Sequence, residues 1–62
     1  MPDLKFVDLA CELRHETVRA YLVFDGAKEV WIPKSLVEAC PERGEIWTFT
    51  MPEWLAQREG LI

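Results

Sequence analysis

Hydrophobic and polar positions alternate along the first third of the chain. One set of alternating apolar residues is Val7, Leu9, Cys11 and Leu13. A second set is Val18, Ala20, Leu22 and Phe24. A period of two is typical of a β-strand with one buried face. The two segments therefore predict a pair of antiparallel strands.

A tight turn at residues 15–16 brings these two predicted strands into register. Leu13 then lies opposite Val18, and every further pair on that face is apolar. On the other face Glu12 falls opposite Arg19, which is a favourable cross-strand charge pair. A slip of one residue mixes the two faces, so the pattern favours this register. His-Glu is an unusual sequence for a two-residue hairpin turn, and a longer loop centred on the same point keeps the register.

The middle of the chain predicts a turn, a third strand and a helical turn. The turn Asp25-Gly26-Ala27-Lys28 leads into a strand over Glu29–Ile32. Pro33 ends that strand because it has no amide proton for the ladder. Ser35 with Glu38 forms a capping-box pattern that predicts a helical turn over residues 36–39. Residues 40–45 follow as a surface loop, since Pro41 prevents extension of the helix.

The last third predicts a fourth strand and a helix. The strand covers residues 45–51 and carries apolar groups on both faces, so its inward side stays open. Thr50 and Glu53 form a second capping-box pattern before a short helix over residues 54–59. Gly60 suits the left-handed residue that closes a helix, and Leu61 can fold back on that helix.

Together these elements predict one α+β domain over residues 1–62. It is a four-stranded antiparallel β-meander with a short helical turn, and a C-terminal helix packs on the sheet. The central strands carry apolar groups on both faces, so the pattern leaves open whether the sheet stays open or curls into a small barrel. The segment Trp31-Ile32-Pro33 also resembles the strand-to-helix junction of SH3-like barrels, so a small barrel remains an alternative.

The net charge of the chain and the placement of its basic residues disfavour some classes of function. The net charge is −4, and the seven Lys and Arg residues are scattered along the chain. Clustered basic residues are what phosphate backbones and anionic membranes need, so direct nucleic-acid binding and membrane docking are disfavoured. No apolar run approaches the roughly 20 residues of a membrane span. A cytoplasmic protein with free thiols is the expectation.

Residues for catalysis or metal binding are scarce. His15 is the only histidine, and the two cysteines, Cys11 and Cys40, show no metal-ligand spacing. Cys11 is expected in the core, because it lies on the apolar side of its strand. The three glycines are isolated, so no phosphate-binding loop is present. The sequence predicts a protein that is not an enzyme and that needs no cofactor and no metal.

Carboxylates and tryptophans are the candidate contacts with a partner. The carboxylates expected on the interaction surface are Asp8, Asp25, Glu29, Glu42 and Glu45. Glu38 and Glu53 are set aside because they are expected to cap helices, and Glu12 because of its predicted pairing with Arg19. The three tryptophans either all lie in the core, or at least one is an exposed anchor. Trp31 is the chosen candidate. The alternative is that the acidity serves solubility alone.

Two segments resemble a family. Trp31-Ile32-Pro33-Lys34-Ser35 and the closing Pro52-Glu53-Trp54-Leu55-Ala56 with Gly60-Leu61-Ile62 resemble a group of small uncharacterised proteins of phages and prophages. The resemblance covers roughly residues 17–62 and implies no functional residues. A phage-type origin implies, by analogy with anti-CRISPR proteins, a small acidic inhibitor in the host cytosol.

Three functions follow as hypotheses. The first is a protein-binding inhibitor of host nucleic-acid-handling machinery, which uses carboxylates and an exposed aromatic to engage a basic surface and so acts as a nucleic-acid mimic. The second is a structural or accessory phage module that forms a homodimer through an aromatic patch. The third is a pocket between protomers that sequesters a nucleotide-like signal, against which stands the lack of a phosphate-binding loop or basic cluster.

Overall fold

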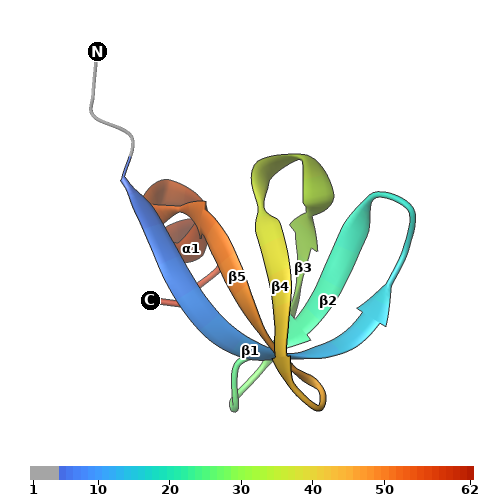
Figure 1. Ribbon diagram of the computed structural model, residues 1–62. Helices are drawn as coiled ribbons and strands as arrows, with labels where there is room; N and C mark the ends of the chain where they lie inside the picture. The colour runs from blue at the N-terminus through green and yellow to red at the C-terminus, as the bar shows by residue number, and fades with distance from the viewer. Residues whose placement is uncertain (1–4) are drawn as a thin grey trace.

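The strands form one antiparallel sheet of five members in a computed structural model that describes residues 5–62. The elements in chain order are β1 (Phe6–Glu16), β2 (Ala20–Phe24), β3 (Glu29–Pro33), the 3-10 turn η1 (Lys34–Leu36), β4 (Glu38–Arg43), β5 (Ile46–Pro52) and the helix α1 (Glu53–Arg58). The spatial order of the strands is β3-β2-β1-β5-β4. Figure 1 shows the long β1 curving through the sheet, so that it pairs with β2 along one half and with β5 along the other.

The prediction of a four-stranded meander is correct for the antiparallel sheet and wrong for its strand number and order. A fifth strand, β4, occupies residues that were expected to form a helical turn and a loop. In addition, β1 lies between β2 and β5, so β3 and β4 are consecutive along the chain but are not paired. The two outer edges remain unjoined, and the sheet is not closed into a barrel.

The predicted helical turn over residues 36–39 is replaced by η1 and the start of β4. No side chain caps η1, and Val37 is already extended, with φ −132° and ψ 155°. Pro41 is tolerated within β4 because β4 is an edge strand. The ladder between β4 and β5 uses alternate residues, and Pro41 falls on the side that faces away from β5. Its missing amide proton therefore costs no ladder hydrogen bond.

The predicted register between the first two strands is wrong. Leu13 pairs with Val23 rather than with Val18. The reason is the turn: the Thr17 hydroxyl oxygen accepts a hydrogen bond from the Ala20 amide at 3.0 Å, and the Thr17 amide donates to the Ala20 carbonyl at 2.8 Å. This turn moves the hairpin loop to residues 17–19, so β2 begins later than expected. The predicted cross-strand pair of Glu12 with Arg19 does not form.

The shifted register changes which face of β2 is buried. Tyr21 packs against the core and Val23 is fully buried, whereas Leu22 and Phe24 lie on the opposite, outer face. One extra residue in β1, between the pairs formed by Leu13 and His15, breaks the regular pairing with β2. Such a bulge reverses the side to which the following residues point. His15 therefore lies on the outer face, and it contacts Trp31 there.

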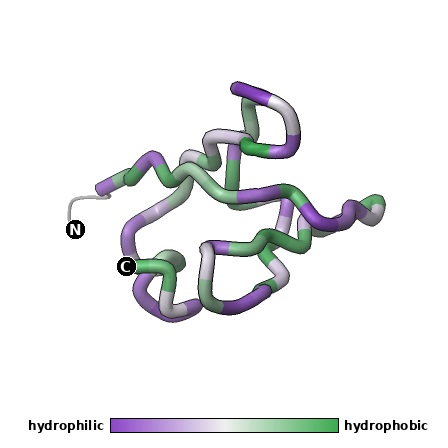
Figure 2. The backbone as a smooth tube through the Cα atoms, turned by 90° about the horizontal axis from the view of Figure 1, so that it is seen from below, coloured by the Kyte–Doolittle hydropathy of each residue, from purple (hydrophilic) through white to green (hydrophobic). Residues whose placement is uncertain are grey.

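The core lies on the inner side of the curved sheet. Its buried residues are Cys11, Val23, Ile32, Phe49, Met51, Leu55 and Ala56. Seen from below in Figure 2, strands from all parts of the chain surround this common centre. The Tyr21 and Phe49 rings meet edge to face, with their centroids 5.5 Å apart. The burial of Cys11 is as predicted, and the buried Phe49 and Met51 settle the inward face of β5.

The C-terminal helix packs on the sheet, as predicted. Leu55 and Ala56 of α1 are buried in the core. The helix ends as the sequence predicts: Gly60 has φ 75°, its amide donates to the Gln57 carbonyl at 3.1 Å, and the Leu61 amide donates to the Ala56 carbonyl at 2.8 Å. These two bonds satisfy carbonyls that the last helical turn leaves free.

The start of α1 differs from the prediction. Pro52 is the N-cap residue, and no side chain caps the helix. The expected capping box of Thr50 and Glu53 is therefore wrong, because Thr50 still belongs to β5 and its hydroxyl is used by Asp8. The Glu53 amide donates instead to the Lys5 carbonyl at 2.7 Å. In the chain from residue 5 onward, no helix has the length and apolar character that a membrane crossing requires.

Candidate protein-interaction surface

Carboxylates gather on the outer face of β1, β5 and β4. Thr50 of β5 pairs with Asp8 of β1 on one side and with Glu38 of β4 on the other. One pleat further along, the Thr48 hydroxyl donates to Glu42 of β4 at 3.1 Å. We call Asp8, Glu38 and Glu42 the acidic face. Two strands that are distant along the chain, β1 and β4, thus bring their negative charges to one surface, and β5 lies between them.

The threonines between these carboxylates hold them in place. The Thr50 hydroxyl donates to Asp8 at 2.5 Å, as the Thr48 hydroxyl does to Glu42. A hydroxyl donor orients a carboxylate without neutralising it. The acidic face therefore keeps its full negative charge while two of its three side chains are fixed.

Other carboxylates of the chain are neutralised by nearby cations. Within residues 5–62 the ion pairs are Glu12 with Arg14, Glu16 with Lys34, Asp25 with Lys28, and Glu59 with Arg58. None of these four pairs involves the acidic face. The acidic-face carboxylates thus keep their charge without an ion pair in this part of the chain, as do Glu29, Glu45 and Glu53 elsewhere.

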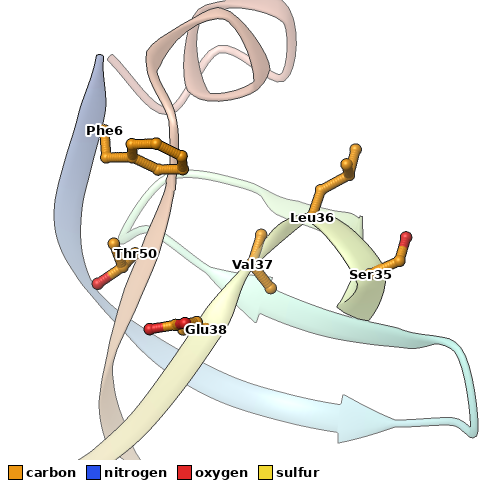
Figure 3. A pocket seen from close by; sticks show the side chains of 6 residues that line it. All are labelled: Phe6, Ser35, Leu36, Val37, Glu38 and Thr50. Carbon is orange, nitrogen blue, oxygen red and sulfur yellow. The ribbon is translucent and has the colours of Figure 1, made fainter. Parts of the chain in front are cut away.

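A groove of about 390 Å³ borders the acidic face. It is lined by Phe6, Ser35, Leu36, Val37, Glu38 and Thr50. Phe6 is 59% exposed and Leu36 is 38% exposed, so the groove offers apolar surface to solvent. Figure 3 shows the Phe6 ring above Thr50 and Glu38, with Leu36 on the far side of β5. Apolar walls and a carboxylate therefore meet in one place.

Three of the carboxylates chosen from the sequence lie elsewhere. Asp25 belongs to the turn between β2 and β3, Glu29 begins β3 and pairs with Phe24, and Glu45 lies in the connection between β4 and β5. Only Asp8 and Glu42 of the chosen set come together. Glu38, which was set aside as a capping residue, joins them instead. Glu38 and Glu42 alternate with Ala39 and Pro41, and this is the sequence signal that could have identified the strand.

Asp25 has a structural role in its turn. Its Oδ1 accepts hydrogen bonds from the amides of Ala27 at 2.8 Å and Lys28 at 2.9 Å, and its Oδ2 lies 3.2 Å from the Lys28 ammonium. These donors, led by the Lys28 amide, lower the pKa of Asp25 from its usual 3.8 to about 2. Because its oxygens already have partners inside the chain, Asp25 is poorly suited to bind another protein.

A second exposed surface lies on the outer face of the other half of the sheet. Trp31 is 48% exposed, pairs with Leu22, and meets the His15 ring edge to face with centroids 6.1 Å apart. We call these three residues the Trp31 surface. Beside it, the Arg14 guanidinium lies 4.4 Å from the centre of the Phe24 ring.

The three tryptophans do not all lie in the core. Trp47 is half-buried and packs against the core, whereas Trp54 on α1 is 44% exposed and lies under the Arg58 guanidinium. The alternative in which at least one indole is exposed therefore holds, and Trp31 is one of the two exposed indoles.

The two cysteines differ in burial and in the environment of their thiols. Cys11 is buried, and desolvation, followed by the charge of Asp25, raises the pKa of its thiol. A raised pKa makes a thiolate nucleophile scarce. Cys40 is exposed, and both thiols are free. Across residues 5–62 no three His, Cys, Asp or Glu side chains are grouped so as to hold a metal ion.

Comparison of the chain with protein-family models, with curated proteins and with solved structures gives no match. The resemblance to phage proteins therefore stays a prediction.

Proposed function

We propose that this chain is a non-catalytic protein-binding domain, and that its acidic face and the adjoining groove engage a basic segment of another protein. The observation that carries the proposal is the convergence of Asp8, Glu38 and Glu42 on one face of the sheet, next to exposed Phe6 and Leu36. Charge steers a basic partner to such a surface, and apolar contacts then hold it there.

The partner class follows from this chemistry. A lysine or arginine side chain has an aliphatic stem and a cationic head. Its stem fits against Phe6 and Leu36, while its head reaches Glu38. Basic side chains of this kind line the surfaces with which proteins bind nucleic-acid phosphates. A nucleic-acid-handling protein is therefore the proposed partner, and occupation of its basic surface would inhibit it. A phage origin and an anti-CRISPR-like role remain part of this proposal.

The proposal is tested by titrating the ¹⁵N-labelled chain with an arginine-rich peptide and following amide chemical shifts. We expect shifts at β1, β4 and β5 around the acidic face, and binding that weakens as salt is added. The double variant Glu38→Lys with Glu42→Lys should lose the binding. Its fold should be kept, because exposed charges contribute little to stability.

A matched control is the double variant Glu29→Lys with Glu45→Lys. It changes the net charge by the same amount, but on carboxylates outside the acidic face. We expect this control to bind the peptide nearly as well as the wild-type chain. Equal loss of binding in both double variants would show that only net charge matters and would remove the acidic face from the proposal.

The inhibitory part of the proposal needs a second experiment. The tagged chain is incubated with bacterial lysate, and the retained proteins are eluted with rising salt or with added duplex DNA. Retention of a nucleic-acid-binding protein that DNA displaces supports nucleic-acid mimicry. Retention that is insensitive to salt and to DNA would refute it.

A further inference from the structure

The edge of β3 carries backbone groups that nothing in the described chain satisfies. The Lys34 amide bonds to the Arg19 carbonyl at 2.8 Å, and the Asp25 amide bonds to the Lys28 carbonyl at 3.1 Å. In an antiparallel ladder alternate residues turn their N–H and C=O toward the neighbouring strand. The backbone groups of Val30 and Ile32 therefore point toward β2. Those of Glu29, Trp31 and Pro33 point away from the sheet, in its plane. No strand in residues 5–62 pairs with that side of β3.

The other sheet edge is built differently. By the same alternation the backbone N–H and C=O groups of Ala39 and Pro41 in β4, and of Val37 just before it, point away from β5. The Val37 amide already bonds to the Lys34 carbonyl, Pro41 has no amide proton, and the register shifts just after Pro41. Proline, charge and bulges are the means by which proteins prevent pairing at an edge. β4 has all three, whereas β3 has a proline and a charged residue, Glu29, only at its two ends and has no bulge, so β3 is the edge that remains able to pair.

The outward groups of β3 complement a second copy of themselves. When two β3 strands run antiparallel about a twofold axis at Trp31, each Trp31 amide meets the Trp31 carbonyl of the other copy. Each Glu29 amide then meets the Pro33 carbonyl of the other copy. Pro33 accepts in this register but cannot donate, so the Glu29 carbonyl of each copy is left without a ladder donor. We propose that this chain forms a homodimer by antiparallel pairing of β3 with β3 of a second copy, centred on Trp31.

Side chains and charges fit this register. The two Trp31 indoles become directly opposite cross-strand neighbours on the outer face, where aromatic pairs stabilise a sheet. The two Glu29 residues lie on opposite sides of the axis, separated by roughly 13 Å along the strands. That separation exceeds the Debye length of about 8 Å at physiological ionic strength, so their repulsion is screened. The dimer places the exposed Trp31 in an interface.

Sedimentation equilibrium of the full chain tests this proposal. Five-residue strands make an interface smaller than the standard of about 800 Å² per partner, so we expect self-association at concentrations on the order of 0.1–1 mM. Trp31→Lys should weaken it by at least about tenfold, since it sets two like charges opposite each other. Trp54→Lys is the control, because Trp54 is nearly as exposed but lies on α1.

Amide hydrogen exchange of the wild-type chain gives a second measurement that needs no variant. The Trp31 and Glu29 amides should exchange more slowly as the concentration rises, whereas the Ala39 amide on the β4 edge should not change. A chain that stays monomeric at about 1 mM overturns the proposal. So does an equal effect of both tryptophan substitutions, or slowed exchange at Ala39 instead of Trp31. Charge reversal of Glu38 and Glu42 leaves this dimer intact, which separates it from peptide binding at the acidic face.

Discussion

Truncation of two neighbouring residues of β2 tests which face of this strand is buried. Val23 is fully buried in the core, whereas Leu22 lies on the outer face beside Trp31. Val23→Ala removes two carbon atoms from the core, at about 0.8 kcal/mol each, and leaves a cavity. We expect a loss of about 2–3 kcal/mol in the free energy of unfolding. Leu22→Ala removes more atoms, but from a partly exposed site, and should cost only about 1 kcal/mol.

These losses are large against the stability of so small a chain. At about 0.05–0.15 kcal/mol per residue, 62 residues give a total of about 3–9 kcal/mol. In a domain of this size 1 kcal/mol shifts the melting temperature by about 4–8 °C. Thermal unfolding followed by circular dichroism should therefore show a decrease of about 10–20 °C for Val23→Ala and a clearly smaller one for Leu22→Ala. A larger decrease for Leu22→Ala would refute the observed register and favour the tight turn at residues 15–16.

Two further predictions concern the thiols and acid stability. The folded chain is alkylated without reductant and its mass is then measured. Cys40 should be modified and Cys11 spared, because Cys11 is buried and the pKa of its thiol is raised. Equal modification of both cysteines would contradict this. The folded pKa of Asp25 is about 2, below its usual 3.8, so its ionised form stabilises the fold above the usual value, and this contribution is lost as the pH falls from about 4 to about 2. Asp25→Asn keeps an oxygen acceptor but no charge. The melting temperature of this variant should fall furthest below that of the wild-type chain near neutral pH, and the difference should shrink toward pH 2. A difference independent of pH would show that the charge is irrelevant.

Local signals predicted the elements that local chemistry controls. The period of two identified β1 and β2, because alternation follows directly from the pleat of a strand. The Asp25-Gly26 turn and Pro33 marked the two ends of β3. Gly60 marked the end of α1, since a residue with positive φ is needed there. Exposure of at least one of the three indoles was one of two alternatives that the sequence left open. None of these inferences needed knowledge of which strand lies beside which.

Local signals failed where two conformations compete for the same residues. The capping pattern at Ser35 and Glu38 predicted a helix, but pairing of Glu38 with Thr50 extends the chain into β4. A capping box contributes about 1 kcal/mol, and a six-residue strand that pairs with β5 outweighs it. Likewise the Thr17 turn and the bulge after Leu13 change the register, although the alternating pattern alone favoured another one.

By itself, then, the sequence determined an acidic antiparallel sheet with a closing helix. The tertiary structure alone decided that β1 lies between β2 and β5, which brings Asp8 beside Thr50, 42 residues away along the chain. A period of two specifies the side to which a residue points, but it does not specify the neighbouring strand. That choice depends on burial of the whole core at once, and the acidic face and the free edge of β3 are consequences of it.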